Sequence, residues 1–195
     1  PLEIIDVSEV FTNTEFKPFR GAIVRAIKVD DIASKPNSWF NEVVDYAKSI
    51  DMPGIGYISV MEDKSLKGPI DKFLTDEDRN ALFKKADLKV GSVLFFIADK
   101  RKDVVTRNAG LIRTELGRKL DLMDHDLFEF CFVTDMPMYE ISEVTGKLDF
   151  MHNPFSMPRG GEKALDEEDP LNIYADQFDV VCNGVELVSG AVRNN

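Results

Sequence analysis

The sequence has 195 residues, which is enough for one large domain or two small ones. Hydrophobic residues make up 44% of it and charged residues 30%, a composition typical of a globular protein. No apolar run approaches the ~20 residues that span a bilayer, so we expect neither a membrane segment nor a signal peptide.

The net charge of −11 is distributed unevenly along the chain. Residues 1–120 carry 20 basic and 19 acidic groups, whereas residues 121–195 carry 4 basic and 16 acidic groups. This asymmetry predicts two units, 1–120 and 121–195. It also argues against binding of a nucleic-acid backbone by the second unit alone, because such binding requires positive charge.

Both cysteines, Cys131 and Cys182, lie in apolar, strand-like runs. We interpret them as packed thiols of a reducing compartment, the cytoplasm, rather than as a disulfide or a metal-binding pair.

Three strands are predicted in the first unit, at residues 21–29, 56–60 and 91–98. The run 91–98 is apolar throughout, which favours a central strand that is buried on both faces. Residues 8–11 resemble the start of a helix with Ser8 as the N-cap.

Three longer helices are predicted between and after these strands. The first begins at residues 36–38, with Trp39, Val43, Tyr46 and Ala47 at helical spacing. The second runs from Asp76 to about Ala86 behind an N-cap at Thr75. The third covers residues 102–120, and its apolar face holds Val105, Ala109, Ile112 and Leu116. Strands and helices alternating in this way predict a compact α+β module.

The second unit has a different pattern, with several strands and short links. Strands are expected at 128–133 and 178–193, with a short extended piece at 149–151 and a loop at 152–161. Residues 163–174 are strongly acidic and are expected to include a short helix. We therefore predict part of an antiparallel sheet with open edges, which favours disorder or pairing between molecules.

The apolar run 178–193 contains Asn183-Gly184, the strongest short signal for a type I′ hairpin turn. Such a turn would place Cys182 opposite Val185 and Val181 opposite Glu186. Asp179 would then face Val188.

The two hairpin acids, Asp179 and Glu186, would then lie on one face, roughly 7–8 Å apart at the backbone. Two acids in apolar strands are costly to bury without a counter-charge, so both could reach a Mg²⁺ ion held by nucleotide phosphates. The alternative is that they point to solvent or pair with a basic residue.

Two further residues are candidates for binding. Arg193 follows the hairpin and could clamp a carboxylate with two hydrogen bonds, or it could be an ordinary surface arginine. His152 lies in a loop fixed by prolines and flanked by aromatic residues, where a structural or exposed histidine is the alternative. No Ser/His/Asp order, phosphate-binding loop or Cys/His metal spacing occurs.

The sequence resembles bacterial-type aspartyl-tRNA synthetase, a class II synthetase, over essentially its whole length. In the second unit the resemblance rests on the runs 132–140, 151–158, 179–186 and 189–193, in the order and spacing of that family. In the first unit it rests on 16–19, 35–39, 68–70 and 72–74, which resemble the family's insertion module, the GAD domain. It implies a GAD-type module followed by part of the class II catalytic sheet.

The resemblance also implies roles for individual residues. Asp179 and Glu186 match the acids that hold ATP-bound Mg²⁺. Arg193 matches the arginine that grips the side-chain carboxylate of aspartate, and His152 matches a histidine that lines the amino-acid pocket. No residue is assigned a chemical step. Many relatives carry a second histidine where this chain has Asn153, which leaves the details of the pocket open.

In the family reaction, the α-carboxylate of aspartate attacks the α-phosphate of ATP to form aspartyl-adenylate and pyrophosphate. The aspartyl group then moves to tRNA(Asp); whether tRNA(Asn) is also charged stays open. The resemblance implies that the parent is a homodimer. It also implies that both ATP-gripping arginines lie outside this chain, so we expect no aminoacylation by the chain alone.

Two other classes of function remain. The first is a non-catalytic GAD-type module that contacts tRNA or a protein partner. The second is a metal-dependent nucleotide enzyme outside the synthetases, which fits the two acids but not the other runs.

Overall fold

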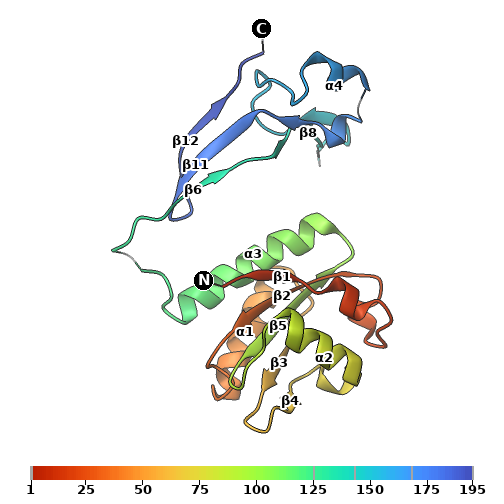
Figure 1. Cartoon of the computed structure of the whole chain (residues 1–195), viewed down its shortest axis with the longest axis vertical. Coiled ribbons are helices and arrows are strands. Elements are labelled where there is room, and N and C mark those ends of the chain that lie inside the picture. The colour runs from red at the N-terminus through yellow and green to blue at the C-terminus, as the bar shows by residue number, and fades with distance from the viewer. Residues whose placement is uncertain (1, 125, 143, 168, 195) are drawn as a thin grey trace. The chain divides into compact units, whose positions relative to one another are not determined.

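The computed structural model describes residues 2–124, 126–142, 144–167 and 169–194. The chain divides into two compact units, Pro1–Met123 and Asp124–Asn195 (Figure 1). Among the described residues, no helix combines the length and the apolar character that crossing a bilayer requires.

The first unit is built on a five-stranded antiparallel sheet in the order β1-β2-β5-β3-β4. Its strands are β1 (Ile4–Asp6), β2 (Ile23–Val29), β3 (Gly56–Val60), β4 (Leu66–Lys67) and β5 (Val93–Asp99). The central place predicted for the apolar run 91–98 is confirmed by β5. The edge strands β1 and β4 were not predicted, because two or three residues are too few to show a period.

Helices cover both faces of this sheet, which explains why β5 is apolar on both sides. Alternate residues of β5 pack into different clusters. Phe95 packs with α1 (Asn37–Ser49) and α3 (Lys102–Lys119), whereas Phe96 packs with α2 (Asp76–Lys85). Short 3₁₀ turns complete the unit: η1 (Ser8–Phe11), η2 (Lys17–Phe19) and η3 (Asp71–Phe73).

The predicted helix faces are largely confirmed. All four apolar residues expected on one face of α3 are fully buried. Thr75 caps α2 with a reciprocal capping box, in which its side chain accepts from the Asp78 N–H at 3.1 Å. In α1 the buried residues are Phe40, Val43 and Ala47, and the predicted Trp39 and Tyr46 pack partly buried against the same core.

The expectation that Ser8 caps a helix is wrong. Ser8 is the first residue of η1, and its hydroxyl donates to the carboxylate of Asp6 at 2.7 Å. Asp6 also accepts from the Ser8 N–H, and the Ser8 hydroxyl accepts from the Val24 N–H at 3.0 Å instead of from an N–H of the following turn.

The second unit holds a three-stranded antiparallel sheet in the order β12-β11-β6, formed by β6 (Phe130–Val133), β11 (Gln177–Cys182) and β12 (Val185–Ala191). Two strand pairs accompany it: β7 (Met136–Pro137) with β10 (Tyr174–Ala175), and β8 (Tyr139–Ile141) with β9 (Leu148–Phe150). Helices α4 (Glu162–Glu167) and η4 (Pro170–Asn172) link β9 to β10. The chain as a whole is therefore α+β, as predicted.

This second sheet leaves much apolar surface in solvent. Phe130 and Phe132 are 65% and 69% exposed, and Leu187 is 57% exposed. Cys182 is a buried free thiol, as expected, but Cys131 is exposed, so its prediction as a packed residue is wrong.

Candidate substrate-binding site

The β11–β12 hairpin turns at Asn183-Gly184, where both residues have positive φ (49° and 81°) as a type I′ turn requires. The expected pairs Cys182–Val185 and Val181–Glu186 are present. Beyond them the register shifts at a β-bulge, because Leu187 is an extra residue in β12.

The bulge overturns the predicted pairing of Asp179 with Val188. Asp179 lies opposite Ser189, and Val188 lies opposite Val180 on the other face of the sheet. The turn sequence fixes only the pairs next to it, so it gave no signal for a bulge further along.

Asp179 and Glu186 nevertheless share a face. Asp179 and Val181 are two residues apart in β11, and Glu186 is the partner of Val181. Asp179 is half-buried and Glu186 is exposed. Within the described ranges neither carboxylate has a basic partner at ion-pair distance, so their oxygens remain available to a ligand.

The backbone brings Arg193 and the loop of His152 together. Ser156 forms an isolated antiparallel bridge with Arg193. The Met157 N–H donates to the Val192 carbonyl at 2.7 Å, and the Asn194 N–H donates to the Phe155 carbonyl at 3.0 Å. His152 itself is exposed and lies three residues before Phe155. The two predicted aspartate-binding residues therefore belong to adjoining segments, although they are 41 positions apart.

The other side of the same segment is tied to the strand pair that leads into β11. The Asp176 N–H donates to the Met157 carbonyl at 2.8 Å, and the Arg159 N–H donates to the Tyr174 carbonyl at 2.7 Å. Ser156 is fully buried and its hydroxyl donates to the Gln177 side-chain oxygen at 3.3 Å. Residues 155–159 are thus fixed between the end of β12 and the start of β11.

Arg159, which sequence reasoning missed, joins three parts of this unit. Its guanidinium lies 2.7 Å from Asp135, which follows β6, and 3.4 Å from Asp176. A hydrogen bond from Arg159 holds the pKa of Asp135 below its usual value, and the same contact raises the pKa of Arg159. An isolated arginine in a loop gives no sequence signal for partners at these separations.

A metal ion would find two carboxylates here. Among the described residues, no group of three or more His, Cys, Asp or Glu side chains gathers to form a complete metal site. The two acids suit Mg²⁺, which is bound through one or two carboxylates together with substrate phosphates and water.

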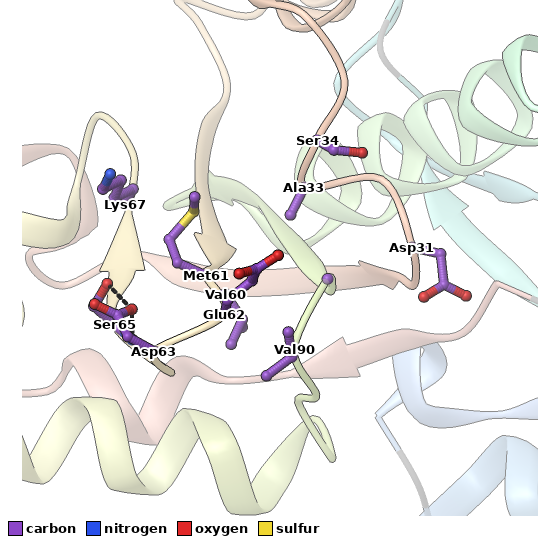
Figure 2. Close-up of a pocket in the computed structure, with 11 residues that line it drawn as sticks. Asp31, Ala33, Ser34, Val60, Met61, Glu62, Asp63, Ser65, Lys67 and Val90 are labelled. Carbon is purple, nitrogen blue, oxygen red and sulfur yellow. Dashed lines mark hydrogen bonds between the residues drawn. The ribbon is translucent and has the colours of Figure 1, made fainter.

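Two cavities lie elsewhere, in the first unit. One of about 670 Å³ is lined by the loops before α1, between β3 and β4, and before β5. Figure 2 shows its acidic side chains Asp31, Glu62 and Asp63, with Asp63 hydrogen-bonded to Ser65. That bond lowers the pKa of Asp63. The other cavity, about 710 Å³, is lined by Lys28, Lys35 and Lys85 among others. None of the predicted site residues lines either one.

Comparison with known families identifies the class of the first unit. The model of the GAD domain matches residues 16–108, which cover β2 through β5 and the first part of α3. Residues 16–108 are therefore similar to a GAD domain, as the insertion runs predicted.

Comparison with curated proteins finds relatives that match the whole chain. It is 46% identical over 194 residues to an aspartate–tRNA ligase of Streptomyces coelicolor, and 46% identical over 201 residues to an aspartate–tRNA(Asp/Asn) ligase of Wolbachia pipientis. An aspartate–tRNA(Asp/Asn) ligase of Rickettsia felis is 44% identical over 204 residues. Each match covers 100% of this chain but only 33–34% of the relative.

The chain is thus similar over its whole length to about one third of these curated ligases, and the predicted resemblance is confirmed.

Proposed function

We propose that this chain is part of an aspartate–tRNA ligase and that its second unit contributes to the site for aspartate and ATP. The similarity of the whole of this chain to part of the curated ligases supports the enzyme class. The observation that carries the site is the pairing of residues 155–157 with 192–194, because it joins the loop of His152 to Arg193.

Arg193 has the chemistry to select aspartate. A guanidinium presents N–H donors in a planar fork that matches both oxygens of a side-chain carboxylate. Asparagine and glutamine lack that negative charge. His152, in the adjoining loop, would line the same pocket.

Asp179 and Glu186 would hold Mg²⁺ bound to the phosphates of ATP. When bound, that ion would neutralise charge on the phosphoryl oxygens. The aspartate α-carboxylate would attack the α-phosphate, the bond to the β,γ-pyrophosphate would break, and aspartyl-adenylate would form. Because charge is spread over oxygens in the transition state, positioning and electrostatics would provide most of the catalysis. The aspartyl group would then pass to tRNA.

The further partners are part of the same proposal: tRNA(Asp) is the acceptor, and a second copy of the full-length product is the dimer partner. The proposed compartment is the cytoplasm. The relatives include both aspartate–tRNA and aspartate–tRNA(Asp/Asn) ligases, so tRNA(Asn) is a second candidate acceptor.

Aspartate-dependent ATP–pyrophosphate exchange by the product of the full reading frame around this chain tests the proposal. We expect D179N and E186Q to lower exchange at least about 30-fold, the scale of a lost charge contact in a ligand site. R193Q should raise KM for aspartate by a similar factor. D126N, at an exposed acid of the same unit, is the control. Unchanged exchange in all three site variants would refute the assignment.

The alternative is a non-catalytic GAD-type module that binds tRNA or a protein. The GAD match to residues 16–108 favours it only for the first unit. The near-neutral charge of residues 1–120 gives weak electrostatic attraction to a nucleic-acid backbone, so we expect weak or no tRNA binding by them. A salt-sensitive micromolar complex between this chain and tRNA would support the alternative.

A further inference from the structure

The guanidinium of Arg193 lies against an aromatic ring. Its central carbon is 4.0 Å from the centroid of the Phe155 ring. An approach in the plane of the ring at that distance would collide with the ring hydrogens, so the guanidinium lies over the ring face. This is well inside the ~6 Å range of a cation–π contact.

The backbone fixes both residues of this pair. Arg193 lies between two hydrogen bonds to the loop, from Met157 to Val192 and from Asn194 to Phe155. On its far side the loop is held by two hydrogen bonds. The Asp176 N–H donates to the Met157 carbonyl, and the hydroxyl of the buried Ser156 donates to the Gln177 side chain. The ring therefore comes from a segment whose position is set independently of the Arg193 side chain.

The choice of an aromatic partner matters because this unit is strongly acidic. Residues 121–195 contain only four basic residues, and Arg159 is already paired with two carboxylates. An acidic partner would neutralise Arg193 and compete with a substrate carboxylate. An aromatic ring carries no negative charge and no oxygen acceptor, so it holds the cation without neutralising it.

We infer that Phe155 is a positioning residue: its ring holds the Arg193 guanidinium so that the N–H edge stays free for the side-chain carboxylate of aspartate. This inference rests on the proposed function, since it assigns Arg193 a carboxylate ligand. Phe155 acts through Arg193 and touches no reacting atom.

The contact should affect aspartate binding specifically. Cation–π contacts contribute between about 0.5 and 2 kcal/mol, which corresponds to roughly twofold to thirtyfold in binding. In F155L, which keeps an apolar side chain without the ring, KM for aspartate should rise by a factor in this range. Neither kcat nor KM for ATP should change by more than about twofold. F155Y, which restores the ring, should return KM for aspartate to near the wild-type value.

Phe150 provides the matched control. It is 42% exposed, against 44% for Phe155, and its ring pairs with Tyr139 at 4.9 Å instead of with an arginine. We expect F150L to leave KM for aspartate unchanged. Hydrogen exchange of the amides in residues 174–194 checks that the sheet is intact, and F155M replaces F155L if leucine disturbs it.

The experiment is ATP–pyrophosphate exchange with the full-length product, titrated separately with aspartate and ATP. A wild-type protein with no aspartate-dependent exchange would overturn the proposed function itself. Wild-type exchange with an unaltered aspartate KM in F155L or F155M would overturn the role of Phe155 alone. An F155Y variant as impaired as F155L, or an equal rise in KM for ATP, would also contradict it.

Discussion

The ring of Phe178 covers Gly190, its direct partner across β11 and β12. A Cβ atom added at position 190 would lie 2.6 Å from the Phe178 ring carbon Cζ and 2.8 Å from Cε1. Phe178 also packs on Phe132 of β6, with ring centroids 5.9 Å apart. One aromatic side chain thus links all three strands, and the missing side chain at Gly190 makes room for it.

We predict that G190A destabilises the second unit by about 1–3 kcal/mol, because overpacking forces the Phe178 ring out of its place. Hydrogen exchange of the β11 amides measures the effect. G190A combined with F178A should cost less than the two separate changes together. Additive costs would show that the ring and the glycine are not coupled.

Gly117 in α3 provides the comparison for Gly190. Nothing is within 4 Å of a Cβ at Gly117, so G117A should stabilise the first unit by up to about 1 kcal/mol through helix propensity. Trp39 is the only tryptophan, and it packs in the first unit, so its fluorescence reports unfolding of that unit. A loss of stability in G117A would contradict the open space described at this position.

The capping box of α2 predicts a contribution of Thr75 to the stability of the first unit. We predict that T75A lowers the free energy of unfolding of the first unit by about 1 kcal/mol, because the Asp78 N–H loses its acceptor. T75S keeps the hydroxyl and should behave as wild type. Urea denaturation followed by Trp39 fluorescence measures both.

Thr114 is the control for this substitution. It is an exposed residue inside α3, where alanine has the higher helix propensity, so T114A should not destabilise the protein. Equal losses in T75A and T114A would contradict a role for the cap.

Sequence reasoning located most of the first unit because its elements are long and periodic. The helical spacing of Val105 and Ile112 reflects burial of one helix face in one core, and the apolar run of β5 reflects burial of both strand faces in two cores. Phe40, beside Trp39, was not predicted to be buried. Its ring packs against Tyr57 of β3 and Phe95 of β5, which only the folded sheet brings next to it.

The ion pair between Arg159 and Asp135 predicts a pH dependence. The pKa of Asp135 is lowered, so its contribution to stability is present above the ordinary carboxyl pKa and is lost as the pH falls through the lowered value. In R159Q, we predict that the Asp135 pKa returns upward toward the ordinary range. A ¹³C NMR titration of the side-chain carboxyl measures it directly.

Lys163 is one of the few other basic residues of this unit and serves as the control. K163Q should leave the Asp135 titration unchanged. An Asp135 pKa that is the same in wild type and R159Q would show that Arg159 does not cause the shift.

The candidate site was only partly accessible to sequence reasoning. The Asn183-Gly184 turn correctly put Val181 opposite Glu186, but the bulge at Leu187 changed the partner of Asp179. The face shared by Asp179 and Glu186 survived because the bulge lies beyond Glu186. Phe155 and Arg159 were missed because both act through residues distant in sequence, and only the folded chain brings those residues together.

The most direct test of this account is aspartate-dependent ATP–pyrophosphate exchange, measured in parallel on the 195-residue chain and on the product of the full reading frame. The chain spans about one third of the relatives it matches. We therefore predict clear exchange by the full-length product with aspartate, little with asparagine, and none by the chain alone. Exchange by the isolated chain, or its absence from the full-length product, would contradict the account.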